Sequence, residues 1–229
     1  MIEKRTASEA WRPQTFGDRN AKQIPDPVIE PLWIGTRVLA HVDDGAVELR
    51  DDAGRPVDRP PIADALAAAV DAASAVLDAY LTAQAARSGV GVHLGPTVEL
   101  PTPGQAARQM LVGGGRGRRA EAVEALEDRV ADLEAAPSEG LVLVAVDLLF
   151  LDGDSLLDVP LLERKRLLDS VLIENELVRV GIHVRVPVNP WLPTWRNLGF
   201  RSLAYKDANG RYRPGQRNDG WAKATIPRG

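Results

Sequence analysis

The stretch that most restricts the fold of this chain is LVLVAVDLLFLDG, residues 141–153. It is an almost unbroken run of apolar β-forming residues, interrupted by Asp147 and ended by an Asp-Gly turn. A strand with one face in water alternates polar and apolar residues, whereas this run has no polar face to offer. We therefore predict a strand that is buried on both faces.

The other segments mix helices and strands around this strand. TRVLAHVD and GAVELRDD predict a β-hairpin from residue 36, and AVLDAYLTAQ (75–84) predicts a strand. Apolar spacing predicts helices over 61–74, 118–135 and 160–172, and residues 86–116 are Gly- and Pro-rich loops with one short strand. Residues 177–188 alternate like a strand, 189–200 indicate a helical turn, and 202–206 and 221–226 close the fold as strands. Without a regular βαβ alternation, the fold class is α+β.

Domain organisation and location follow from composition. Residues 1–27 are polar and lack periodicity, so we expect an N-terminal arm or irregular lead-in before a domain over 28–229. The start of the chain has no apolar signal-peptide core and no run is long enough to span a membrane, so we expect a cytoplasmic protein without membrane contact. The absence of cysteine excludes disulfides and thiolate zinc sites, and three scattered histidines make a metal cluster unexpected. A net charge of −4 gives no global attraction to nucleic acid, although local basic patches remain possible.

Several short motifs have simpler structural interpretations. GGGRGRRA formally contains G-x-G-x-x-A, but the residues before it are loop-like, which favours a loop over a dinucleotide site. Asp51-Asp52 and the pair Asp152 and Asp154 lie at turns, where Asp bonds the backbone. His41 and His183 are expected inside strands rather than as ligands, and Trp191 and Trp195 as core anchors.

The C-terminal segment GFRSLAYKDANGRYRPGQRNDGWAKAT is more informative. It combines basic and aromatic residues between two predicted strands: Lys206, Arg211, Arg213, Arg217 and Lys223 with Tyr205, Tyr212 and Trp221. Such a loop suits contact with phosphate groups, and the alternative is a solvated charged hairpin.

At this segment the sequence resembles the adenylation domain of bacterial ATP-dependent DNA ligases. GFRSLAYK, YRPG and GWAKAT are similar to the family's G-L-E-G-V-V-A-K, Y-R-P-G and D-W-L-K-V-K. VDLLFLDG, EPLWIGTRVLAHVDDG and AVLDAYLTA resemble F-D-L-L-Y-L-D-G, E-P-K-W-D-G-Y-R-x-L-A-H-V-D-G-G and V-L-D-G-E-L-V-A. These segments occur in the family's order over roughly residues 28 to 226. The resemblance implies a ligase-type nucleotidyltransferase domain with antiparallel sheets flanked by helices.

The resemblance also implies a mechanism, in which a lysine attacks the α-phosphate of ATP and the AMP then passes to a DNA 5′-phosphate. Aligned with the motifs, this chain lacks the required groups. The nucleophilic lysine falls on Leu32, the following aspartate on Ile34, and the acid of D-G-E on Tyr80. The adenine-stacking phenylalanine falls on Val146, the metal-binding glutamate on Arg201, and the second lysine of L-K-V-K on Thr225. We therefore expect neither catalytic residues nor a metal site.

Other family positions are retained. Glu30, Arg37, Asp147, Lys206 and Lys223 match, and the resemblance implies nucleotide contacts for Glu30, Arg37, Lys206 and Lys223. The chain ends shortly after WAKAT, so we also expect no OB-fold domain.

The sequence thus predicts a pseudo-ligase that acts by binding. One version contacts DNA or a DNA-repair partner through Arg211, Arg213 and Arg217, together with Lys206 and Lys223. A second version binds ATP or AMP without covalent attachment. The enzyme alternative is a divergent ligase with a separate OB-fold partner or a displaced nucleophile.

Overall fold

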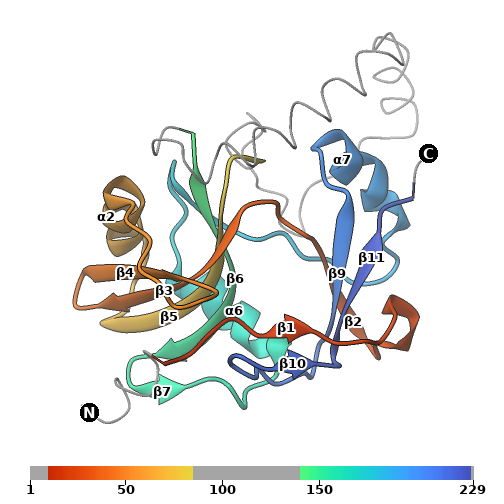
Figure 1. Cartoon of the computed structure of the whole chain (residues 1–229), viewed down its shortest axis with the longest axis horizontal. Coiled ribbons are helices and arrows are strands. Elements are labelled where there is room, and N and C mark those ends of the chain that lie inside the picture. The colour runs from red at the N-terminus through yellow and green to blue at the C-terminus, as the bar shows by residue number, and fades with distance from the viewer. Residues whose placement is uncertain (1–9, 85–139, 228–229) are drawn as a thin grey trace, which may run out of the picture.

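The fold is built from a larger and a smaller antiparallel sheet (Figure 1). A computed structural model describes residues 10–84 and 140–227. The larger sheet has the order β4-β3-β5-β6-β7, with β8 beside β6 in parallel. Its strands are β3 (Thr36–Asp43), β4 (Ala46–Asp51), β5 (Ser74–Thr82), β6 (Val142–Leu151), β7 (Asp154–Ser155) and β8 (Val178–Val180).

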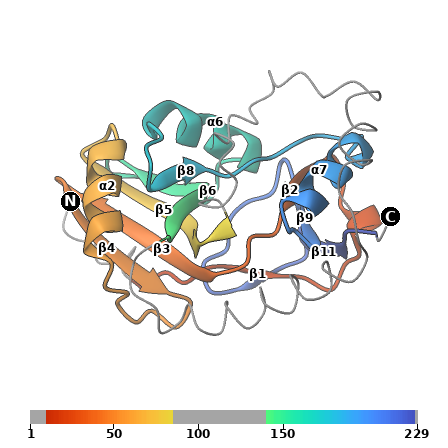
Figure 2. The same ribbon diagram turned by 90° about the horizontal axis from the view of Figure 1, so that it is seen from above.

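The smaller sheet has the order β11-β9-β2. It is formed by β2 (Pro27–Pro31), β9 (Ser202–Asp207) and β11 (Trp221–Thr225). A separate short parallel pair joins β1 (Thr15–Phe16) to β10 (Arg217–Asn218). The two sheets lie on either side of the molecule in both views, with β6 central (Figure 2). The predicted α+β class with antiparallel sheets is confirmed.

Strand β6 is buried on both faces, as its apolar run predicts. Leu143 and Ala145 pack in a core with α2 (Pro60–Ala69) and α6 (Leu161–Val171). Val142, Val144 and Val146 face the opposite way and pack in a second core, together with Ile29 and Leu203 of the smaller sheet. One strand therefore separates the helix-covered side of the larger sheet from the side that faces the smaller sheet.

Most of the predicted elements are present. The hairpin, the strand over 75–84, the helices α2 and α6 and the closing strands β9 and β11 all form. Residues 189–200 form the short helices η2 (Asn189–Trp191) and α7 (Leu192–Asn197), and Trp195 is a fully buried anchor, whereas Trp191 is half-buried. The predictions for residues 86–116 and 118–135, including the Gly-rich motif, lie outside the described residues.

The prediction of one strand over 177–188 is wrong. Only Val178–Val180 pair as β8, and Val184 makes an isolated bridge to Ile29 of the other sheet. His183 therefore lies between these two pairings and not inside a strand, whereas His41 lies within β3 as expected. The segment leaves one sheet to contact the other, which a period-two pattern cannot distinguish from a continuous strand.

Asp51 and Asp152 bind backbone N–H groups at turns, whereas Asp154 lies in strand β7. Asp51 accepts hydrogen bonds from the backbone N–H groups of Ala53 and Arg55 at 3.0 and 2.8 Å. Asp152 accepts one from Ser74 N–H at 3.0 Å. These bonds are the backbone role that the sequence favours over metal binding.

The expected arm contains ordered elements within its described part. Besides β1, residues Ala21–Gln23 form a 3-10 helix, η1, with a capping box between Asn20 and Gln23. Among the described residues, no helix is long and apolar enough to cross a membrane.

Candidate functional site

Leu32 lies just after β2 and is held there through the backbone. Its N–H donates to Ser202 O at 2.9 Å, and the side chain is half-buried. Ile34, also half-buried, donates its N–H to Gln84 Oε1 at 2.7 Å and accepts from Thr82 Oγ1 at 2.7 Å. Neither side chain offers a lone pair or a charge, so this turn contributes shape and no nucleophile.

The backbone around position 35, in the same turn, requires a glycine. The φ of Gly35 is +151°, and a Cβ there would lie 2.1 Å from the carbonyl oxygen of Leu81. No side chain fits at this approach, because the obstacle is backbone of the neighbouring strand. The glycine is therefore a requirement of the fold whether or not chemistry takes place nearby.

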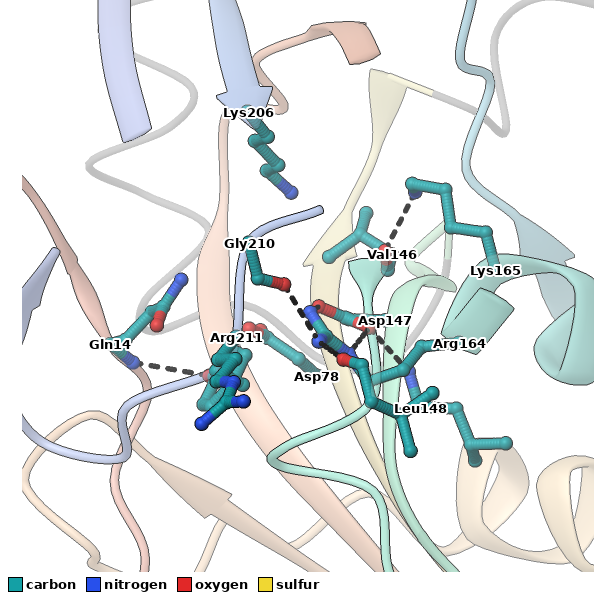
Figure 3. Close-up of polar contacts among 12 residues, drawn as sticks. Gln14, Asp78, Val146, Asp147, Leu148, Arg164, Lys165, Lys206, Gly210 and Arg211 are labelled. Atoms are coloured by element: carbon teal, nitrogen blue, oxygen red, sulfur yellow. Dashed lines mark hydrogen bonds and ion pairs between the residues drawn. The ribbon is translucent and has the colours of Figure 1, made fainter. Parts of the chain in front are cut away.

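Glu30 is the centre of a buried ion cluster. Its carboxylate lies 2.6 Å from Lys206 Nζ and 2.6 Å from Lys165 Nζ, and each of the three side chains is at most 4% exposed. Lys165 also donates to Val146 O at 2.9 Å, and the Lys206 ammonium lies 4.2 Å from the centre of the Trp221 ring. Figure 3 shows Lys165 reaching the Val146 carbonyl from α6 and Lys206 descending from β9.

The cluster perturbs the protonation of its members. Burial raises the pKa of Glu30, but the two ammonium groups outweigh it and lower this pKa from 4.5 to about 2. Burial lowers the pKa of Lys206, although Glu30 opposes this shift. Burial and the positive charge of Lys165 lower the pKa of nearby His183 from 6.5 to about 4. Glu30 is thus ionised, and His183 neutral, at physiological pH.

Arg37 is fixed by a second buried pair. Its guanidinium donates to both oxygens of Asp78, at 2.8 and 2.5 Å, and to Gln14 O at 2.7 Å. It lies between two aromatic rings, with the Tyr80 centroid at 5.9 Å and the Trp221 centroid at 5.5 Å. Burial alone would lower the pKa of Arg37, but the negative charge of Asp78 has the larger effect. The pKa of Arg37 therefore lies well above its ordinary value.

Asp147 and Arg164 form a third pair, in which neither side chain is exposed. Arg164 donates to the two carboxylate oxygens at 2.8 Å each, and also to Val159 O and Gly210 O (Figure 3). Asp78 and Asp147 are direct cross-strand partners in β5 and β6. Their like charges would repel, and each aspartate therefore has its own arginine.

The positions that the resemblance assigns to metal and adenine contacts hold Tyr80, Arg201 and Val146 in this chain. Tyr80 and Val146 both pack in the second core, and burial raises the pKa of Tyr80 from 10.0 to about 12, so its phenol is neutral. Arg201 is half-buried beside β9. Within residues 10–84 and 140–227, no three His, Asp or Glu side chains are grouped as a metal ion would require.

The expected nucleic-acid contacts lie elsewhere, in a loop over residues 208–219 that we term the basic loop. Arg211, Arg213 and Arg217 are exposed there; Arg211 pairs with Asp158 at 3.2 Å and Arg217 pairs with Asp18. Lys223 is exposed on β11, with its ammonium 4.6 Å from the Phe16 ring centroid. The structure therefore separates the expected contacts into an outer basic set and a buried set of Glu30, Arg37 and Lys206. Burial removes Lys206 from the side chains that an external phosphate can reach.

Sequence reasoning missed the partners of this buried set. Lys165 and Arg164 share the buried face of α6 with Leu161 and Leu168, at positions i, i+3, i+4 and i+7. Basic residues on an apolar stripe are a readable signal, because a buried cation requires a partner. Gln14 gave no comparable signal, since it lies in a polar segment without periodicity.

The fold has two antiparallel sheets, which the chain joins at the turn after β2. These sheets carry the motif residues Glu30, Arg37 and Asp147, each in an ion pair. This arrangement defines a ligase-type nucleotidyltransferase domain. A family model described as ATP dependent DNA ligase domain matches residues 20–224, and the chain belongs to this family.

Solved structures agree with this fold. Mycobacterial DNA ligase D complexed with ATP and MES is 21% identical, with a TM-score of 0.61, over 95% of this chain and 60% of that chain. The ligase domain of M. tuberculosis LigD gives 23% identity and a TM-score of 0.58 over the same shares. A Lig E DNA ligase gives 14% identity and a TM-score of 0.53, over 93% of this chain and 68% of that one. The chain thus spans 60% of the length of the two ligase D structures. Comparison with curated proteins gives no match.

Proposed function

We propose that this protein is a ligase-like domain without nucleotidyl transfer, a pseudo-ligase, which acts by binding nucleic acid through its outer basic residues. The observation that carries the proposal is Leu32, which stands where the family's motif requires a lysine. Leucine has no lone pair, so no shift in local electrostatics makes it a nucleophile. The neutral Tyr80 and the cationic Arg201 likewise replace carboxylates, which are the ligands that Mg²⁺ prefers.

The two buried lysines, Lys165 and Lys206, are not placed to act instead of Leu32. Lys206 is opposite Val28 in the β2–β9 register, whereas Leu32 is bonded to Ser202. The offset of four residues corresponds to about 13 Å along a strand. Lys165 is held between Glu30 and the Val146 carbonyl. Both amines belong to a structural cluster, which supports inactivity.

Glu30 and Arg37 already form ion pairs within the protein, which argues against the alternative that they bind ATP or AMP. A nucleotide that used Glu30 would compete with two ammonium groups at 2.6 Å, and one that used Arg37 would compete with a bidentate aspartate. Breaking a buried charge pair costs about 3–5 kcal/mol, which a small ligand would have to offset. Arg211 and Arg217 of the basic loop also have acidic partners, but these are exposed surface pairs that cost at most about 1 kcal/mol to open, so a phosphate backbone can replace them more easily.

Two measurements test the proposal. Incubation with ATP and Mg²⁺ followed by intact-mass analysis should give no AMP adduct, and a stable adduct would overturn inactivity. Titration onto nicked duplex DNA over a range of salt concentrations should give binding that weakens as salt rises, because phosphate contacts release counterions. No binding at low salt would exclude the DNA version and leave a protein partner as the expected ligand.

Family membership favours one alternative, a divergent ligase that depends on a separate OB-fold partner or a displaced nucleophile. A nick-sealing assay with ATP and Mg²⁺ distinguishes the two. Sealed product, lost when Lys165 or Lys206 is replaced by Met, would support the alternative.

A further inference from the structure

The basic loop is held by two different parts of the molecule. Its first half is bonded to the chain at the start of α6. Tyr212 N–H donates to Leu157 O at 2.9 Å, Leu161 N–H donates to Gly210 O at 3.1 Å, and Leu162 N–H donates to Ala208 O at 3.0 Å. Arg211 belongs to this half. The backbone on either side of Arg211 is therefore bonded to the chain at the start of α6, and the Arg211 carbonyl also accepts from Asn218 Nδ2 at 3.0 Å.

The second half is bonded to residues 12–17, which we term the N-terminal strap. Gly215 N–H donates to Arg12 O at 2.7 Å, and Thr15 N–H donates to Gln216 O at 2.9 Å. The pairing of β1 with β10 places Thr15 opposite Arg217. The strap also brings Phe16 under Lys223, so the same segment contacts three of the outer basic residues or their backbone.

Gln14 is the central contact of the strap and is fully buried. Its side-chain oxygen Oε1 accepts from Arg213 N–H at 2.7 Å and from Asn218 Nδ2 at 3.1 Å. Its backbone N–H donates to the Tyr212 hydroxyl at 3.1 Å, and its carbonyl accepts from Arg37 at 2.7 Å. One oxygen atom thus binds the backbone of Arg213 and the side chain of Asn218, which lie on either side of Arg217, and holds both against the strap.

The two ends of the Gln14 amide differ. Oε1 has two donors, whereas Nε2 is buried and has no hydrogen-bond partner within the described part of the chain. A buried unpaired amide N–H group costs about 1–3 kcal/mol. A purely space-filling residue at this position would avoid that cost, so the useful group is the acceptor oxygen that binds the loop.

We propose that Gln14 is a positioning residue for nucleic-acid binding, which fixes the second half of the basic loop so that Arg213 and Arg217 face a duplex phosphate backbone together. The inference rests on the proposed DNA-binding function. Residues that are ordered before binding lose less conformational entropy on contact, so fixing the backbone raises affinity without adding a contact. The strap is thereby part of the interface although Gln14 touches no ligand.

A double-mutant cycle tests this role. Gln14→Met keeps the volume and removes the acceptor, and the ligand is a nicked duplex at fixed low salt. We expect Gln14→Met to weaken binding about tenfold, because Arg213 and its neighbours lose their fixed backbone, and to reduce the salt slope by about one. Arg213→Ala should cause a similar loss, and the two changes together little more than one alone. In an Arg211→Ala background most of the Gln14 effect should remain, because Gly210 and Tyr212 on either side of Arg211 are bonded to the chain at the start of α6.

The possible outcomes separate this inference from the proposed function. Wild-type protein that does not bind DNA overturns both. Wild-type protein that binds, with Gln14→Met either harmless or fully additive with Arg213→Ala, overturns only the role of Gln14. Amide hydrogen exchange at Arg213 gives an independent reading, since loss of its acceptor should speed exchange about tenfold or more while the Tyr212 amide is unchanged.

If Gln14→Met lacks a cooperative unfolding transition, Thr15→Pro replaces it. Thr15 is exposed, and proline there removes the N–H that bonds Gln216 and so loosens the pairing of the strap with the second half of the basic loop. The same loss of affinity and the same non-additivity with Arg213→Ala are expected, and full additivity would again overturn the proposal.

Discussion

The two buried charge systems of this domain differ in how completely they are satisfied. Asp147 with Arg164, and Asp78 with Arg37, are one-to-one bidentate pairs whose remaining donors bond backbone carbonyls. Glu30 instead faces two ammonium groups, so the second system carries one more cation than anion. Bidentate arginine pairs balance charge and geometry together, whereas two lysines around one carboxylate leave excess charge in a low-dielectric site.

This difference indicates which of the motif residues have a structural role in the fold. Asp147, Asp78 and Arg37 pin strands β3, β5 and β6 to α6 and to the strap, so their loss would disturb the fold. The positions of Leu32, Tyr80 and Val146 support no such pairs. At Tyr80, a neutral phenol in place of a carboxylate removes the desolvation cost of a buried charge.

The largest expected effect comes from breaking a balanced pair. Arg164→Met leaves Asp147 as an unpaired buried charge and removes bonds to Val159 and Gly210, so we expect a loss of about 4 kcal/mol in the free energy of unfolding. Urea denaturation measures it. Arg166→Met is the matched control on the same helix, because Arg166 is 70% exposed and pairs with Glu163 at the surface; its effect should be within about 0.5 kcal/mol. Equal losses for both variants would contradict the assignment.

The stability that the Glu30 cluster contributes should depend on pH. The folded-state pKa of Glu30, about 2, lies below the unfolded value of 4.5, so the stability it contributes is present above about pH 4.5 and lost as pH falls toward 2. The full difference corresponds to about 3 kcal/mol. Denaturation curves between pH 2.5 and 7 should show this loss in the wild type and a flatter profile in Glu30→Gln. Glu163→Gln, an exposed control, should keep the wild-type profile.

His183 adds a smaller step at higher pH. Its folded-state pKa of about 4 lies below 6.5, so the unfolded chain binds the proton more tightly and stability falls as pH drops from about 6.5 to 4. The side chain is only partly buried, which reduces the expected loss to about 2 kcal/mol. The groups that face it are Lys165, Glu30 and Lys206. His183→Asn should remove this step and leave the Glu30 step below pH 4.5; an unchanged profile between pH 4 and 6.5 would refute the assignment.

The sequence predicted the fold better than the partners within it. The apolar run at 141–153 predicted β6 because burial on both faces leaves a pattern in one stretch. The apolar stripe of α6 indicates that Lys165 is buried, but no pattern in the sequence identifies Glu30 as its partner, because helix α6 and strand β2 meet only in the folded chain. Gln14 was unreadable for the same reason: its role depends on a loop about 200 residues away, and its neighbours have no periodicity.

The smallest stability effect, and the sharpest functional one, concerns Leu32. This side chain is half-buried, and a lysine can extend its ammonium group to water while its stem covers the same surface, so Leu32→Lys should change stability by less than about 1 kcal/mol. The restored amine should still give no AMP adduct with ATP and Mg²⁺, because Tyr80 is a neutral phenol and Arg201 repels a divalent cation.

Intact-mass analysis compares this variant with the triple variant Leu32→Lys, Tyr80→Glu, Arg201→Glu, which restores both acids. An adduct in the single variant would mean that the acids are dispensable and that Leu32 alone blocks transfer. An adduct confined to the triple variant would show that the metal ligands and the nucleophile were lost as one unit.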